Sequence, residues 1–218
     1  MRFKSNGFES RIFDEIDNDK DKIYALYTVG FDPTKNDQWM QLYHRCSYLQ
    51  LGGKLLLGAT WNNFDLDKDN SKCRVPVVMG ASYFFSRCYF NKLKGFEGLR
   101  LYGREEEYLS IKSWGIGHGC YLIKDIQVAH LYRKVAPQPI TRKEVWHNIL
   151  IIGETLLSKS LCVKIADKMI AKDNLTFQRL YKELDHEKCK ELRNYYKSLG
   201  YSYKKFEIIN TEVFNHNN

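Results

Sequence analysis

The order of strand-like and helix-like segments between residues 75 and 130 constrains the fold more than any other feature of the sequence. Residues Val75–Phe85 are rich in β-branched and aromatic side chains and predict a buried strand, with Gly80 at a point of close approach. A short helix is expected over Ser86–Leu93 and another over Glu105–Trp114. A glycine-rich turn then leads into a strand over Cys120–His130. This alternation of strands and helices predicts an α/β fold.

The residues before this segment predict further strands and one helix. Ile23–Val29 reads as a strand that follows a charged run. Apolar side chains recur at helical spacing in Gln38–Leu51, and Gly52-Gly53 would end that helix. Lys54–Thr60 is another predicted strand.

The character of the chain changes near Pro137 and Pro139, after which the pattern is helical. Thr141 and Glu144 have the spacing of a capping box, and Asp185 is placed to cap a later helix. The chain therefore divides into a portion of mixed strands and helices over 1–136 and a helical extension of two to four helices over 137–218.

Composition indicates a packed globular protein without covalent staples. The 218 residues carry a formal net charge of +8, which favours polyanionic partners such as nucleotides or anionic headgroups. The six cysteines include no CxxC pair, so reduced core thiols are expected and a zinc knuckle is not. No signal peptide or membrane-length apolar run is visible, so we expect a cytoplasmic protein, with peripheral contact at an inner membrane surface left open.

Two acidic runs invite a calcium interpretation, which their spacing excludes. An EF-hand loop needs Gly at its sixth position and an acidic ligand at its twelfth. The run from Asp17 supplies Lys22 and Thr28 there, and the run from Asp65 supplies Asn70 and Pro76. Both runs are better interpreted as solvated loops.

Three successive carboxylates begin the predicted helix at Glu105. At about 100° per residue they fan around the helix axis, so at least one can face a cleft. Taken alone they are ordinary first-turn acids, which the helix dipole favours in any helix.

The motifs of residues 76–134 together resemble the second half of the catalytic domain of GT-A type glycosyltransferases. The resemblance is strongest to the polypeptide N-acetylgalactosaminyltransferases and the family 2 enzymes related to them. In that family a small-residue pair, an aromatic-Gly-x-Glu motif, a Trp, a Gly-rich turn and a His-aromatic-Arg motif follow one another. The matching residues are Gly80-Ala81, Tyr102-Gly103-Arg104-Glu105-Glu106, Trp114, Gly115–Gly119 and His130-Leu131-Tyr132-Arg133.

The resemblance implies a GT-A-like mixed sheet flanked by helices, incomplete at the amino end, with a carboxy-terminal helical tail. It implies transfer of a sugar from a nucleotide-diphosphate donor, most simply a uridine one, to a glycan or other hydroxyl acceptor. Glu105 or Glu106 would act at the transfer centre, and His130 would bind a divalent Mn²⁺ or Mg²⁺. The other residues expected to contact donor or acceptor are Gly80, Ala81, Ser82, Gly103, Arg104, Trp114 and Arg133.

Simpler interpretations of two of these residues stay open. His130 ends an alternating strand, where a histidine is often a hydrogen-bonded core residue, and Trp114 could fill the core beneath the acidic helix. The amino end also shows no buried strand leading into an Asp-x-Asp motif, so the nucleotide-binding half would come from another polypeptide or be reduced.

The tail supports a second hypothesis, a non-catalytic module that binds nucleic acid or anionic glycan. Tyrosines and lysines alternate over Tyr195–Lys197 and Tyr201–Lys205, as in surfaces that stack bases and contact phosphates. No recognised nucleic-acid motif accompanies them, so no specific nucleic acid is expected as a partner.

Overall fold

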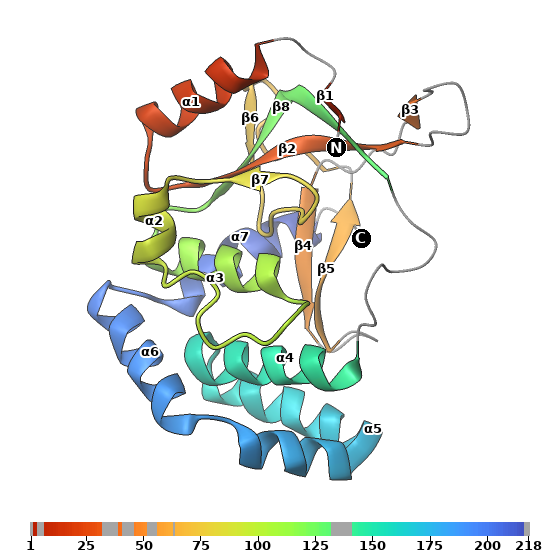
Figure 1. The fold of residues 1–218 in the computed structure, drawn as a ribbon, viewed down its shortest axis with the longest axis vertical. Coiled ribbons are helices and arrows are strands. Elements are labelled where there is room, and N and C mark those ends of the chain that lie inside the picture. The colour runs from red at the N-terminus through yellow and green to blue at the C-terminus, as the bar shows by residue number, and fades with distance from the viewer. Residues whose placement is uncertain are drawn as a thin grey trace.

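The computed structural model describes residues 2–3, 7–31, 39–40, 46–51, 56–62, 64–131 and 141–215, and it has a mixed sheet at one end and a helical layer at the other (Figure 1). Within these residues, one sheet has the order β1-β8-β2-β3, with β6 added on β8 and β7 on β2. A separate hairpin pairs β4 with β5. The strands are β1 (Arg2–Phe3), β2 (Ile23–Phe31), β3 (Trp39–Met40), β4 (Cys46–Leu51), β5 (Leu57–Asn62), β6 (Lys72–Arg74), β7 (Tyr83–Phe84) and β8 (Cys120–His130).

The parallel pair β2 and β8 forms the centre of the sheet. Ile23 lies opposite Cys120 and Gly30 opposite His130, with a register shift between Leu26 and Tyr27. The other neighbours of this pair are antiparallel, so the sheet is mixed as expected. The register carries His130 to the end of the central strand pair.

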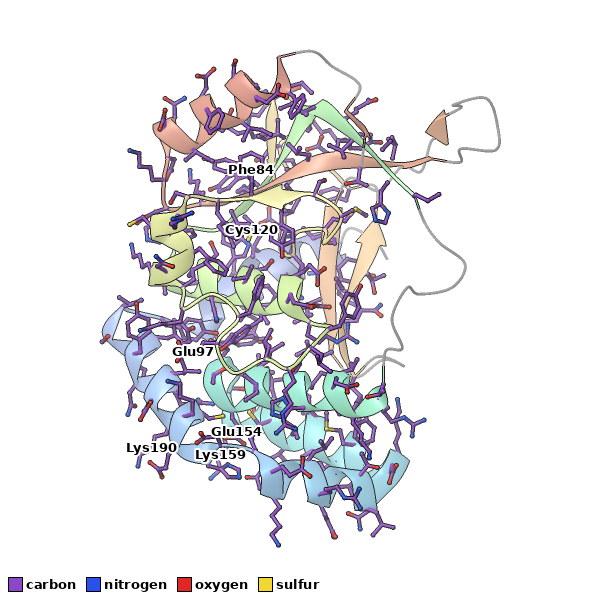
Figure 2. All side chains as sticks on the ribbon, viewed as in Figure 1. Phe84, Glu97, Cys120, Glu154, Lys159 and Lys190 are labelled. Carbon is purple, nitrogen blue, oxygen red and sulfur yellow. The ribbon has the colours of Figure 1, made fainter. Side chains whose placement is uncertain are left out.

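Helices cover both faces of the sheet. On one face α1 (Phe8–Asn18) packs Phe8 and Ile12 against a cluster of apolar residues that includes Phe84. On the other face α3 (Glu105–Ile116) and α2 (Arg87–Lys92) enclose a second cluster, which includes Cys120. Figure 2 shows Phe84 and Cys120 on these two sides of the sheet.

Helix α3 is the central element, because it is buried along nearly its whole length between the sheet and α4. Its polar side chains are satisfied inside the core. Ser110 accepts the amide of Val78 at 3.1 Å, and Ser113 donates to the carbonyl of Gly119 at 2.6 Å. Burial of this helix on all sides fixes the direction in which its amino-terminal carboxylates point.

The tail forms four helices in the described residues, α4 (Arg142–Leu156), α5 (Lys159–Glu183), α6 (His186–Ser198) and α7 (Tyr203–Asn215). Both predicted caps are present, since Thr141 accepts the amide of Glu144 and Asp185 accepts that of Lys188. One apolar cluster joins residues of 1–136 to residues of all four tail helices. The tail is therefore packed into the same core as residues 1–136.

The tyrosines of the basic tail face inward. Tyr196 is fully buried and donates its hydroxyl to the carbonyl of Leu93, and Tyr201 donates to the carbonyl of Leu156. Rings held in this way cannot stack on nucleic-acid bases, so the structure gives no support to the hypothesis of a nucleic-acid module.

Two predicted elements are wrong. The helix expected over Gln38–Leu51 is absent from its described residues, which form β3 and β4. Pairing of β4 with β5, together with a two-way hydrogen bond between Leu49 and Asn210 of α7, overrides the helical spacing. Of the single strand expected over Val75–Phe85, only Tyr83–Phe84 forms a strand, β7, whereas residues 75–82 form an irregular segment after β6 that carries Gly80.

The second acidic run needs no calcium, because basic side chains neutralise it. Lys124 lies 3.0 Å from Asp65, and Arg74 lies 3.2 Å from Asp67. Helix α1 was not predicted, because the first twenty residues were interpreted as a polar, charged segment, although Phe8, Ile12 and Ile16 recur in it at helical spacing. Among the described helices, none combines the length and apolar character needed to cross a bilayer.

Candidate active site

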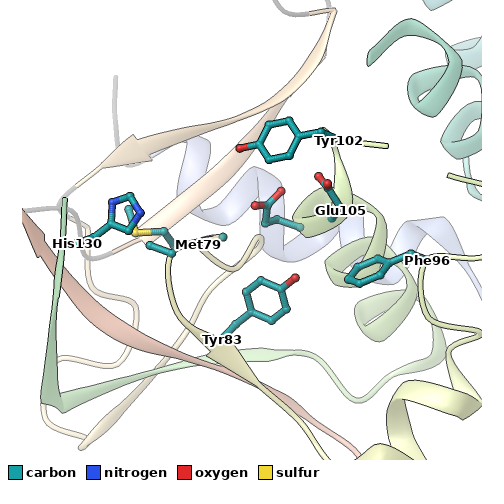
Figure 3. A pocket seen from close by; sticks show the side chains of 9 residues that line it. Met79, Tyr83, Phe96, Tyr102, Glu105 and His130 are labelled. Atoms are coloured by element: carbon teal, nitrogen blue, oxygen red, sulfur yellow. The ribbon is translucent and has the colours of Figure 1, made fainter. Parts of the chain in front are cut away.

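A pocket of about 460 Å³ opens where the irregular segment after β6, the start of α3 and the end of β8 meet. Figure 3 shows His130 and Met79 on one side of it and Phe96 and Glu105 on the other, with Tyr83 and Tyr102 between. The pocket therefore gathers residues that are up to 51 positions apart in the sequence, and its lining residues are Met79, Gly80, Ala81, Tyr83, Phe96, Tyr102, Glu105, Glu106 and His130.

The first turn of α3 places two carboxylates at this pocket. Arg104 precedes the helix with a left-handed backbone (φ 77°), as does Gly103 (φ 105°), so the chain turns sharply into α3. Glu105 folds back and accepts the amide of Gly103 at 2.8 Å. This bond satisfies a backbone donor just before the helix and fixes the Glu105 side chain beside the pocket.

Glu106 is the carboxylate whose acidity differs most from its ordinary value. Burial, and then the negative charges of Glu107 and Glu105, raise the pKa of Glu106 to about 7. A carboxyl group with such a pKa exchanges protons readily near neutral pH, which is what acid/base chemistry requires.

Gly80 provides the space that the Glu106 carboxylate occupies. A Cβ atom at residue 80 would lie only 1.7 Å from Oε1 of Glu106. Because Gly80 has no positive φ, steric space and not backbone freedom explains the glycine here. The close approach predicted for Gly80 is therefore present, and it is made with a carboxylate of the protein itself.

The third carboxylate and its neighbour lie outside the pocket. Glu107 is buried, accepts the amide of Ala59 in β5 at 3.0 Å and pairs with Arg104 at 3.0 Å. Arg104 thus has a structural contact and does not line the pocket, although it was expected to contact donor or acceptor. The two residues tie α3 to the β4–β5 hairpin.

Other expected site residues are also placed elsewhere. Ser82 is buried and its hydroxyl lies 2.9 Å from that of Thr28, so it joins the segment to β2. Trp114 donates its indole N–H to the carbonyl of Val75 at 3.0 Å and packs in the core, where the structure matches the simpler interpretation. Neither lines the pocket, and Arg133 lies outside the described residues.

His130 reaches the pocket from the end of β8, on the side opposite Glu105 (Figure 3). No cluster of three metal-binding side chains occurs in the part of the chain that the structure describes. Among the described residues, His130 alone is therefore in place as an expected metal ligand, because Glu105 and Glu106 line the pocket without forming a metal-binding group with it.

Aromatic side chains form the walls of the pocket, and the sequence argument did not assign them a role. Tyr102 belongs to the aromatic-Gly-x-Glu motif of the family resemblance, and Met79 and Tyr83 belong to the segment predicted as a strand, whereas Phe96 had no sequence signal. Burial, followed by the charges of Glu106 and Glu105, raises the pKa of Tyr83 to about 12. Its phenol stays protonated at neutral pH and can donate a hydrogen bond into the pocket.

Known proteins share both the fold and part of the sequence. No model of a known protein family matches the chain. Over 139 residues it is 30% identical to polypeptide N-acetylgalactosaminyltransferase 5 of Mus musculus, and equally to that of Rattus norvegicus. The match covers 59% of this chain and 15% of each relative.

The crystal structure of GalNAc-T7 with UDP, GalNAc and Mn²⁺ superimposes with a TM-score of 0.70 at 16% identity. That match covers 93% of this chain and 37% of GalNAc-T7. In part of its sequence and in its fold the chain is therefore similar to polypeptide N-acetylgalactosaminyltransferases. The expected GT-A-like mixed sheet flanked by helices is confirmed, and the chain spans only a minor part of the proteins that it matches.

Proposed function

We propose that this domain is the catalytic portion of a glycosyltransferase that moves a sugar from a nucleotide-diphosphate donor to a hydroxyl of a glycan or other acceptor. The observation that carries the proposal is the pocket itself, which brings Gly80, Ala81, Glu105, Glu106 and His130 together in a GT-A-like fold. A uridine donor is favoured, because the matched structure was solved with UDP and GalNAc.

In the proposed reaction the acceptor oxygen forms a bond to the anomeric carbon of the sugar, and the bond from that carbon to the diphosphate breaks. The acceptor proton leaves as the new bond forms, and Glu106 is the pocket carboxylate whose raised pKa suits it to receive that proton. Glu105 would hold a sugar hydroxyl by a hydrogen bond, and Tyr83 and Tyr102 would form the walls against which the sugar lies.

A divalent ion would bind beside His130, which would supply one nitrogen ligand. A bound Mn²⁺ or Mg²⁺ would neutralise the charge of the departing diphosphate. The remaining ligands would come from outside the described residues, including a second polypeptide that supplies the nucleotide-binding half. The presence of Mn²⁺ in the GalNAc-T7 structure supports this part of the proposal.

The test combines donor binding with turnover. UDP-N-acetylgalactosamine is titrated into the domain with and without Mn²⁺ by calorimetry, and transfer to acceptor hydroxyls is then assayed. Glu106→Gln should lower kcat by roughly 10²–10⁴-fold while the fold, followed by circular dichroism, is retained. His130→Ala should raise the Mn²⁺ concentration needed for donor binding.

Glu187→Gln is the matched control, since Glu187 is 84% exposed on α6 and far from any pocket residue in sequence. It should leave binding and turnover unchanged. Unchanged turnover in both Glu105→Gln and Glu106→Gln would reject the catalytic roles. Absence of any donor binding, with or without Mn²⁺, would reject the proposed function of the domain.

A further inference from the structure

The loop between α2 and α3 carries two pocket residues, Phe96 and Tyr102, in a conformation that the chain does not favour by itself. Leu101 and Arg104 have positive φ angles of 41° and 77°, a region that non-glycine residues seldom adopt. The side chains of Leu101 and Tyr102 are exposed, so the loop gains little from burial of its own apolar groups. Contacts with the core beneath the loop must therefore hold its backbone in this conformation.

The amide of Asn148 on α4 supplies that support. Asn148 is fully buried, and its Nδ2 donates to the carbonyls of Arg100 at 2.9 Å and Gly103 at 2.7 Å. Its Oδ1 accepts the backbone amide of Arg100 at 2.8 Å. One side chain thus bonds to the backbone on both sides of Tyr102.

The same contacts extend to a candidate catalytic carboxylate. Gly103, whose carbonyl Asn148 holds, donates its own amide to Glu105 at 2.8 Å. A displacement of Asn148 would therefore reach both Tyr102 and the first turn of α3. The other aromatic wall is held in a similar way, because Lys112 donates to Gly95 and the Tyr108 hydroxyl donates to Glu97, on either side of Phe96.

We infer that Asn148 is a positioning residue, through which the tail helix α4 sets the place of Tyr102 and Glu105 at the pocket. Its side chain does not line the pocket, and it acts through the backbone of residues 100–103. The inference rests on the proposed function only for its kinetic consequence. The structural consequence can be measured without any ligand.

Asn148→Asp separates the two halves of the contact. The carboxylate keeps an acceptor for the Arg100 amide but loses both donors and places a negative charge against two carbonyls. Asn210 offers a matched control, because its amide makes the same kind of two-way contact with Leu49 in β4, at 2.6 and 3.0 Å. Asn210→Asp loses an equivalent donor far along the chain from the loop.

Hydrogen exchange followed by mass spectrometry is measured on both variants, and KM for UDP-N-acetylgalactosamine is measured alongside. Asn148→Asp should speed exchange over residues 99–104 roughly tenfold or more, since the variant loses both buried hydrogen bonds that Nδ2 donates to this backbone. Asn148→Asp should also raise KM for the donor. Asn148→Gln keeps both polar groups, so it should restore part of the slow exchange and part of the wild-type KM. Asn210→Asp should lower stability without changing exchange over residues 99–104 or KM.

The wild-type protein provides a test that needs no variant. Arg100 is exposed at the surface, yet its amide should exchange slowly, as a helix amide does, because Asn148 accepts it. Exchange of that amide at the rate of an unfolded chain would overturn the inference, as would identical protection of residues 99–104 in Asn148→Asp and Asn210→Asp. If the donor does not bind at all, the proposed function fails while the exchange data still decide the role of Asn148.

Discussion

The carboxylate of Glu106 fills the space that a side chain on Gly80 would need, with 1.7 Å between a Cβ atom placed there and Oε1. This relationship joins the irregular segment after β6 to the first turn of α3. It makes the position of Glu106 depend on a residue 26 places earlier in the chain.

Gly80→Ala should therefore affect activity more than stability. The atom in conflict is the end of a flexible side chain, so Glu106 can turn away at small cost, but it then leaves its place in the pocket. We expect thermal unfolding within a few degrees of wild type and a loss of turnover close to that of Glu106→Gln. Gly153→Ala is the control, because a Cβ there would meet Cys162 at an ordinary 3.7 Å. Full turnover in Gly80→Ala would contradict the argument.

The raised pKa of Glu106 predicts a dependence of stability on pH. The folded protein holds this proton up to about pH 7, whereas the ordinary pKa of 4.5 governs the unfolded chain. The folded state therefore binds more protons between these values, and this group makes wild type less stable as pH rises through that window. Glu106→Gln should gain stability relative to wild type, by up to about 3 kcal/mol at pH 8. Chemical denaturation at pH 5 and pH 8 measures the difference in free energy of unfolding between the variant and wild type. The same difference at both pH values would count against a raised pKa for Glu106.

Lys112 predicts the opposite trend at higher pH. It is fully buried beside the rings of Tyr108 and Tyr196, and desolvation holds the pKa of Lys112 well below its ordinary value, against the opposing charge of Glu97. The unfolded chain then binds more protons, so this group makes wild type more stable as pH rises toward 10.5. Urea unfolding at pH 7, 8 and 9 should show a free energy of unfolding that increases with pH in wild type but not in Lys112→Met. Parallel profiles for the two proteins would refute a lowered pKa for Lys112.

Trp114→Phe tests whether this indole has a structural role. The variant loses the 3.0 Å hydrogen bond to Val75 and some packing, so we expect a destabilisation of about 1–3 kcal/mol. The KM for UDP-N-acetylgalactosamine should stay unchanged, because Trp114 does not line the pocket. A large rise in KM at unaltered stability would instead favour the sugar-binding role that the family resemblance implies.

Local signals predicted those parts of the fold that local interactions determine. Strand Cys120–His130 has the predicted bounds, and Ser86, Thr141 and Asp185 cap the helices that they were expected to begin. The helix predicted over Gln38–Leu51 failed because distant partners decide that segment. Its described residues pair with β2 and β5 and bond to Asn210, none of which a periodicity can reveal.

The pocket residues could be predicted where a sequence motif indicated both which residue was involved and which way its helix or strand would point the side chain. Two of the three successive carboxylates reach the pocket, as a fan of side chains around a helix requires, and His130 reaches it from the end of its strand. The sequence could not separate these from Arg104 and Ser82, whose partners Glu107 and Thr28 lie in the core. Phe96 lines the pocket because the loop between α2 and α3 carries it there, and the sequence of a loop has no periodic signal from which this could be predicted.

Helix α7 packs against α3 and β4, with Phe206 and Val213 completely enclosed. The scaffold behind the pocket is thus completed by residues that follow the pocket's last lining residue, His130, by more than 70 positions. During synthesis, the segment from Gly80 to His130 would remain without this support until residues 203–215 had also been made. A product that stops before residue 203 would expose apolar surface and become a substrate for chaperones and proteases rather than a slower enzyme.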